Sequence, residues 1–175
     1  MTSDRLWTIL EGIQSHIRAF DSKAQIIIGI DGGIAGFLTN QLLKSGEAWK
    51  QSNTCISGVL CIELQSAALF ATVVSLGFAV FTIHPRLRLN QPHSRTFFAH
   101  IAEEFGNDYA NAAKTFVGMT DDDLDEDIAA QILANSKICA RKATLFKYTL
   151  FLAAAAIVLW IGSLPFCFHV LANLK

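Results

Sequence analysis

Cysteine is scarce in this sequence, and its four copies follow no recognisable pattern. Cys55, Cys61, Cys139 and Cys167 form no CxxC pair, and no histidine stands at the spacing of a zinc site. Zinc sites and disulfide scaffolds both depend on patterned cysteines. We therefore expect neither a metal site nor a disulfide framework, and we interpret the four cysteines as packing residues.

Catalytic motifs are missing as well. The chain has no Walker loop, no GxSxG, no HExxH and no carboxylate pair placed beside a nucleophile, and its five histidines are scattered. A net charge of -1 gives bulk electrostatics no preferred partner. The sequence predicts a protein that is not an enzyme and that carries no cofactor.

Apolar residues, in contrast, are abundant, at 52% of the 175 residues. Three segments are long and apolar enough to cross a bilayer of ~30 Å, which takes ~20 helical residues. They are residues 24–43, 64–83 and 148–171. We predict an all-α integral membrane protein with about three transmembrane helices and a small helical cytoplasmic segment.

Lysine and arginine are distributed unevenly around these spans. Arg5, Arg18 and Lys23 precede the first span, and a basic series within residues 86–147 separates the second span from the third. The opposite side has only Lys44, Lys50 and Lys175. The positive-inside bias therefore predicts a cytoplasmic N-terminus and middle segment, with residues 44–55 and the C-terminus outside.

Four parts are expected along the chain. Residues 1–23 form an amphipathic helix, 24–83 a transmembrane hairpin, 84–147 the cytoplasmic segment, and 148–175 the third transmembrane helix with a short external tail. The first part has one apolar helix face, which either lies on the membrane surface or, as we favour, packs on the middle segment. The face consists of Leu6, Leu10, Ile13, Ile17 and Phe20.

The cytoplasmic segment is predicted to contain an aromatic helix over residues 96–117 and an acidic turn before a last long helix. In that turn Thr120 and Asp123 have capping-box spacing. The run "DDDLDED" lacks the glycine and the final glutamate of a calcium loop, so helix capping is favoured over metal binding. No glycine or proline interrupts residues 121–161, which predicts an unbroken helix into the third span and a bend at Pro165.

The first span contains a carboxylate, in "AQIIIGIDGGIAGFL" at residues 24–38. In hydrocarbon such a group must be paired, protonated or turned toward other protein. Equal depth in the three spans places Asp31 in one layer with the small residues at 75–77 and 153–156. Two roles for Asp31 stay open, a structural contact that fixes helix register and a gating or pore-lining function. Overlapping GxxxG patterns beside it predict close helix approach; they are formed by Gly29, Gly32, Gly33 and Gly36.

Four segments, in order along most of the chain, resemble the Pycsar transmembrane effectors (PycTM). They are "AFDSKAQIIIGI", "HPRL", "FFAHI" and "IAAQILANSKICARK". The resemblance implies a non-enzymatic, multi-pass protein of the bacterial inner membrane that acts in antiphage defence. It would sense cyclic CMP or cyclic UMP from a partner cyclase, impair the membrane and stop growth of the infected cell. We also expect a homo-oligomer and no nucleic-acid partner.

A cyclic mononucleotide calls for a cation, amides and an aromatic wall. On the last helix Gln131, Asn135 and Lys142 fall near one face, with Arg141 on a neighbouring face. Arg95 would supply a second cation, and Phe98 or Tyr109 the wall. The alternative is that the cations are topology anchors and the aromatic residues are core.

Two other functions stay open beside the resemblance. A constitutive small channel or transporter subunit would need no cytosolic ligand. A membrane scaffold would use its middle segment to dock a protein. Binding of a cyclic pyrimidine nucleotide separates both from the effector.

Overall fold

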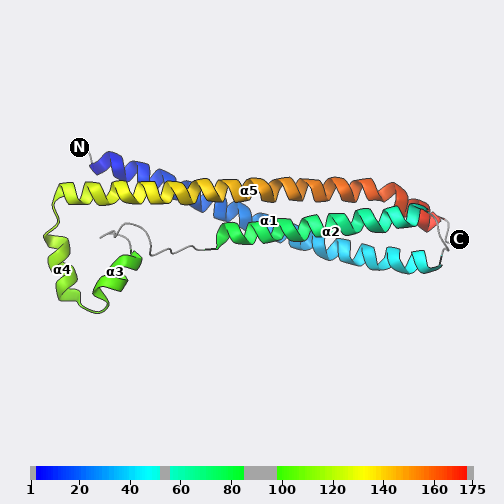
Figure 1. Ribbon diagram of the computed structural model, residues 1–175, viewed down its shortest axis with the longest axis horizontal. Coiled ribbons are helices and arrows are strands. Elements are labelled where there is room, and N and C mark those ends of the chain that lie inside the picture. Colours follow the sequence, from blue (N-terminus) through cyan, green and yellow to red (C-terminus); the bar gives the residue numbers. More distant parts are fainter. Residues whose placement is uncertain (1–2, 52–55, 85–97, 173–175) are drawn as a thin grey trace. The chain divides into compact units, whose positions relative to one another are not determined.

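The computed structural model describes residues 3–51, 56–84 and 98–172. Within these ranges the chain forms five helices and no strand (Figure 1): α1 Ser3–Gln51, α2 Ile56–Ile83, α3 Phe98–Phe105, α4 Tyr109–Val117 and α5 Asp121–Ala172. Three of them, α1, α2 and α5, are long and apolar enough to cross a membrane. The predicted all-α class with three membrane-length helices is confirmed.

Helices α1 and α5 each extend well beyond a membrane span. The expected amphipathic helix and the first span are one helix of 49 residues, and the last cytoplasmic helix continues into the third span in one helix of 52 residues. The prediction of an unbroken helix over residues 121–161 is confirmed. Helix α5 continues through Pro165, and its ribbon bends in its last turns (Figure 1).

The chain divides into two compact units. Unit 1 comprises Met1–Phe20 and His84–Ala143, and unit 2 comprises Asp21–Ile83 and Thr144–Lys175. Unit 2 is a bundle of α2 with the later parts of α1 and α5, which lie side by side (Figure 1). Aromatic contacts join these helices. Phe37 meets Trp160 edge to face at 5.6 Å between ring centroids, and Phe78 lies 5.8 Å from Tyr148.

The interior of unit 2 consists mainly of small and polar side chains, with Leu38 of α1 as a large apolar member. Large apolar residues of α2, such as Phe70, Val73 and Phe81, point outward, where a bilayer would cover them. Small inner residues let membrane helices approach closely, and lipid solvates the apolar outer face. The buried residues of α2 include two rows with seven-residue spacing, Cys61, Ala68, Ser75 and Thr82 in one and Gln65, Thr72 and Ala79 in the other.

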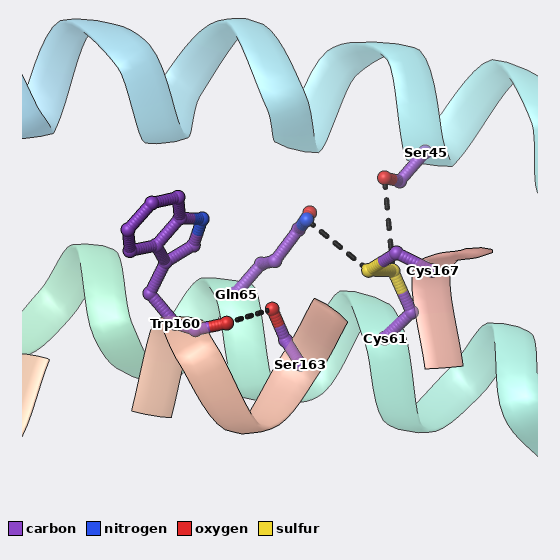
Figure 2. Close-up of a disulfide and its surroundings, with 6 residues drawn as sticks. All are labelled: Ser45, Cys61, Gln65, Trp160, Ser163 and Cys167. Atoms are coloured by element: carbon purple, nitrogen blue, oxygen red, sulfur yellow. Dashed lines mark hydrogen bonds between the residues drawn. A yellow bond between two sulfur atoms is a disulfide. The ribbon is translucent and has the colours of Figure 1, made fainter. Parts of the chain in front are cut away.

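The expectation that the cysteines only pack is wrong at two positions. Cys61 of α2 and Cys167 of α5 form a disulfide, with their Cα atoms 5.2 Å apart (Figure 2). The partners are 106 residues apart and follow no motif, so only the antiparallel packing of α2 and α5 reveals the pair. Both lie at the helix ends that are predicted to face outward, where disulfides persist. Cys139, in unit 1, is a free thiol, which agrees with that orientation.

Unit 1 contains two short helices where the sequence predicted one. Helix α3 ends at Phe105, Gly106 adopts a φ of 49°, and α4 begins at Tyr109. Such a φ favours glycine and ends the helix, and the side chain of Asp108 then accepts a hydrogen bond from the Asn111 backbone N–H at 3.1 Å. Phe105 and Phe116 pack with ring centroids 6.0 Å apart. The prediction of a continuous aromatic helix is therefore wrong at this turn.

The start of α5 has the predicted capping box. The backbone N–H of Thr120 donates to Asp123 Oδ2 at 3.1 Å, and the backbone N–H of Asp123 donates to Thr120 Oγ1 at 3.2 Å. Two N–H groups without helical partners are thereby satisfied. The acidic run thus has a demonstrated role in starting the helix.

The predicted apolar face of the N-terminal helix is its least exposed side. Leu10 is fully buried in unit 1, whereas residues between the stripe positions, such as Trp7 and Ile9, are exposed. The other stripe members are half-buried. This arrangement agrees with packing of the face against protein.

We predict opposite membrane sides for the C-terminus and the middle segment. Reporter domains fused after Lys175 and inserted within residues 90–111 should report the external and the cytoplasmic side, respectively, because the basic residues flank one side of the spans. The same reporters in a strain without induction give the background. Equal signals from both sites would mean that residues 148–171 do not cross the membrane.

Candidate functional site

Asp31 lies inside the bundle of unit 2 and is 1% exposed. The hydroxyl of Ser75, on α2, donates to Asp31 Oδ2 at 2.6 Å. The same hydroxyl lies 3.0 Å from the backbone oxygen of Thr149, on α5, and can donate to it as well. One serine therefore joins α1, α2 and α5. We refer to Asp31, Ser75 and Thr149 as the polar layer.

The polar layer has more acceptors than donors. Ser75 has a single hydroxyl proton, and it faces both a carboxyl oxygen and a carbonyl oxygen. Thr149 adds no donor to the layer, because its own hydroxyl donates to the Leu145 carbonyl at 3.1 Å. In a low-dielectric interior, a hydrogen bond to a carboxyl group is strong and its loss is costly. The layer thus holds the three helices in one register.

The sequence predicted part of this layer. Asp31 was placed at the depth of residues 75–77, and Ser75 does contact it. The third helix contributes Thr149 instead of the expected residues 153–156. The expected depth takes residue 148 as the start of the third span. Helix α5 is continuous there, so no break in the helix marks where the membrane begins.

The glycines of the first span lie on the outside of the bundle. Gly29, Gly32, Gly33 and Gly36 are exposed, and a Cβ added at any of them would meet no atom within 4 Å. The GxxxG patterns therefore bring no described helix of the same chain close to α1. Their role in assembly stays a prediction, and it would involve a second copy.

One of these glycines lies beside an apolar groove. Gly33 lines a groove of about 390 Å³ together with Ile34, Phe37, Ile157 and Trp160. The groove belongs to unit 2, and its wall is formed by α1 and α5. A side chain added at Gly33 would project at this groove without disturbing the polar layer.

We predict that Gly33→Leu reduces self-association and leaves the monomer folded. The new side chain enters open space within one copy, but it would prevent close approach of a second helix. Cross-linking of the full chain in membranes measures this as a loss of dimer and higher bands at equal abundance. Gly162→Leu, also in open space on α5, is the matched control. Unchanged cross-linking in Gly33→Leu would exclude the glycine face as a contact between copies.

The ligand-binding candidates on α5 lie in unit 1. Gln131, Asn135 and Lys142 are half-buried along one side of the helix, and Arg141 is exposed on the neighbouring face. The Gln131 amide nitrogen donates to Asp127 Oδ2 at 3.3 Å, and Asp127 is itself buried. The three residues thus share a partly covered face, as their spacing predicts.

The other ligand candidates are only partly described. Arg95 lies outside the described residues. Phe98 is the first residue of α3, but its side chain is outside the described part. Tyr109 is 81% exposed and makes little contact with unit 1. In the ranges that the structure covers, no cluster of three or more His, Cys, Asp or Glu residues could hold a metal ion.

A second polar group in unit 2, near the disulfide, was not predicted from the sequence. The Gln65 amide nitrogen lies 3.3 Å from Cys167 Sγ, and Ser45 Oγ lies 3.7 Å from Cys61 Sγ (Figure 2). Two buried atoms here, Gln65 Oε1 and Trp160 Nε1, have no hydrogen-bond partner in the described part of the chain. The seven-residue recurrence of polar residues in α2 is the signal that could have identified Gln65.

The comparisons with known proteins give one match. A family model described as the Pycsar effector protein domain (PycTM) matches residues 5–168. No curated protein and no solved structure matches the chain. The family match covers residues of both units and all five helices.

Proposed function

The chain belongs to the Pycsar effector family, and we propose on that basis that it is a membrane effector that binds cyclic CMP or cyclic UMP and impairs the bacterial inner membrane. Family membership assigns it an effector role in antiphage defence. A partner cyclase would supply the nucleotide after infection. The damage to the membrane would stop growth of the infected cell before phage are released.

The observation that carries this proposal is the extent of the family match. It runs from residue 5 to residue 168, so it includes the three membrane-length helices as well as the helices of unit 1. An effector with three such helices and no catalytic motif has a direct target in the bilayer itself. We therefore infer a physical effect on the membrane and no chemical reaction.

The ligand would bind in unit 1, at the half-buried face of α5. Lys142 would pair with the single phosphate charge, and Arg141 or Arg95 would add a second cation. The amides of Gln131 and Asn135 offer both donors and acceptors to the ribose and the base. Phe98 would stack on the flat pyrimidine. Because an amide can meet either base edge, this set is compatible with cytosine or with uracil.

The membrane effect would pass through the polar layer. Helix α5 contains both Lys142 and Thr149, so a shift or rotation of α5 on ligand binding changes the contact of Thr149 with Ser75. Ser75 is also the partner of Asp31. A ligand acts on such an element only through different contacts in its two states. We infer that the bound state separates Asp31 from Ser75 and turns the Asp31 carboxyl group toward the interior of the loosened bundle, so that the effect requires this carboxyl group.

Titration calorimetry on the full chain in detergent tests the proposed ligand. Cyclic CMP, cyclic UMP or both should give saturable heat. Linear 5′-CMP and cyclic AMP serve as controls for the cyclic phosphate and for the base. Flat traces for both cyclic pyrimidine nucleotides would overturn the proposal and favour a constitutive channel or a protein scaffold.

We predict that Lys142→Ala weakens nucleotide binding by ~10-fold or more, because hydrogen bonds to charged groups contribute about 1.5–3 kcal/mol. The same calorimetry gives Kd, and the membrane fraction gives protein abundance. Lys137→Ala removes a charge from an exposed position on another side of α5 and is the matched control. An unchanged Kd in Lys142→Ala would move the phosphate site elsewhere, most simply to Arg95 or Lys23.

We predict that Asp31→Ala abolishes the membrane effect without lowering protein abundance. Removing a carboxylate from hydrocarbon favours insertion, while the carboxyl group that the active state is proposed to require is lost. Membrane-fraction abundance and a membrane-potential dye are measured in the same induced cells. Thr39→Ala, on the exposed side of α1, is the control, since that hydroxyl donates to the Ala35 carbonyl of its own helix.

Two outcomes would contradict this role of Asp31. Normal abundance with undiminished depolarisation would mean that Asp31 takes no part in the effect. A low abundance or a misfolded protein would mean that the bundle does not form without Asp31 and that its role is structural alone. The Thr39→Ala control shows whether α1 tolerates loss of a polar group in general.

A further inference from the structure

The inner face of α2, which consists of its two buried rows, is about as long as the hydrocarbon core of a membrane is thick. The row from Cys61 to Thr82 covers a rise of about 30 Å at ~1.5 Å per residue, which equals the hydrocarbon thickness of a typical bilayer. Each residue of the two rows in α2 is small or polar, and each is buried in unit 2. Small or polar residues therefore line the inner face of α2 from one side of the membrane to the other.

Helix association accounts for the Ser75 hydroxyl but not for three other hydroxyl groups in this interior. Thr72 and Thr82 donate to the carbonyls of Ala68 and Phe78, four residues earlier in α2, at 2.9 and 2.8 Å. In α5, Ser163 donates to its own helix in the same way, at 2.6 Å. Such bonds are local and join no helices. Alanine would allow equally close packing, so the hydroxyls have another use.

Two buried polar atoms of this interior have hydrogen-bonding capacity that water could satisfy. Gln65 is 0% exposed, and its Oε1 has no partner among the described residues. Trp160 Nε1 is likewise buried without a partner there. Figure 2 shows both side chains projecting from α2 and α5 toward α1. An unmet polar group in hydrocarbon costs several kcal/mol. Water can donate to the amide oxygen and accept from the indole N–H.

The charges of this interior favour cations. The polar layer has one hydroxyl proton for two acceptors, one of them the carboxyl group of Asp31. Among the described residues, the buried charged and polar side chains include no lysine and no arginine. Rings of oxygen acceptors and acidic groups replace the hydration shell of a cation and repel anions.

We propose that the inner face of α2 is the wall of a path for water and small cations, which opens through the bundle of unit 2 when the effector is active. This inference rests on the proposed membrane impairment and names its route. The disulfide ties α2 to α5. The described contacts of α1 with these helices are noncovalent, among them Asp31 with Ser75 and Phe37 with Trp160. The path opens as α1 separates from the α2–α5 pair.

Cysteine accessibility tests this route. The full chain with Cys55→Ser and Cys139→Ser, and with its disulfide intact, is placed in liposomes with cyclic CMP and cyclic UMP. A small, positively charged methanethiosulfonate is then added to variants with one new cysteine. Thr72→Cys should react at least about tenfold faster than Val73→Cys, because only a hydrated thiol ionises and reacts. Exposure in the closed structure predicts the opposite order of reaction rates, since Thr72 is 1% exposed and Val73 is 52% exposed.

A second pair guards against a variant that fails to fold. Ala79→Cys, on the inner face, should react faster than Val80→Cys on the outer face. Dissipation of a K⁺ gradient is recorded in the same liposomes. Dissipation with faster reaction of the inner cysteines supports the path.

The contradicting results differ for the two proposals. Dissipation with equal or faster reaction at Val73 and Val80 would place the route outside the bundle and overturn this inference alone. Absence of dissipation with either nucleotide would overturn the proposed membrane impairment and, with it, the path.

Discussion

The Asp31–Ser75 hydrogen bond is the interaction on which unit 2 depends. It places a carboxyl group, which hydrocarbon disfavours, beside the one hydroxyl that also reaches the Thr149 carbonyl. Each of the three helices thereby has a fixed register against the other two. A shift of any one of these helices therefore alters the hydrogen bonds of Ser75. That makes the polar layer a natural element for a switch between a closed and an open bundle.

The distribution of side chains in the rest of the bundle reflects one requirement, that polar residues are surrounded by apolar residues that face the lipid. Phe70, Val73 and Phe81 cover the outside of α2, and small residues line its inside. The Cys61–Cys167 disulfide stabilises one end of this arrangement against separation of α2 and α5. On the proposed path, opening would therefore involve α1, whose described contacts with α2 and α5 are noncovalent. The glycines of α1 face away from the bundle and leave that helix a second surface for another copy.

The sequence predicted the helices well because each carries a local signal: apolar length in three spans, the capping box at Thr120, and the absence of glycine and proline in residues 121–161. It also placed Asp31 near Ser75, since depth follows from counting along a helix. It missed the disulfide and Thr149, which depend on how helices distant in sequence pack. It missed the turn at Gly106, where a positive φ overrides the helical pattern. The ligand face follows from spacing on α5, but its chemistry depends on Arg95 and on the Phe98 side chain, which lie outside the described part of the chain.

Ion flux across a defined membrane tests the central claim most directly. The purified full chain is reconstituted in K⁺-loaded liposomes with a membrane-potential dye, and cyclic CMP or cyclic UMP is added to the side that exposes the middle segment. The account predicts a stable potential before addition and its collapse after addition of a cyclic pyrimidine nucleotide, with no response to linear 5′-CMP. A potential that survives both nucleotides, or that collapses before either is added, would contradict a ligand-gated membrane effector.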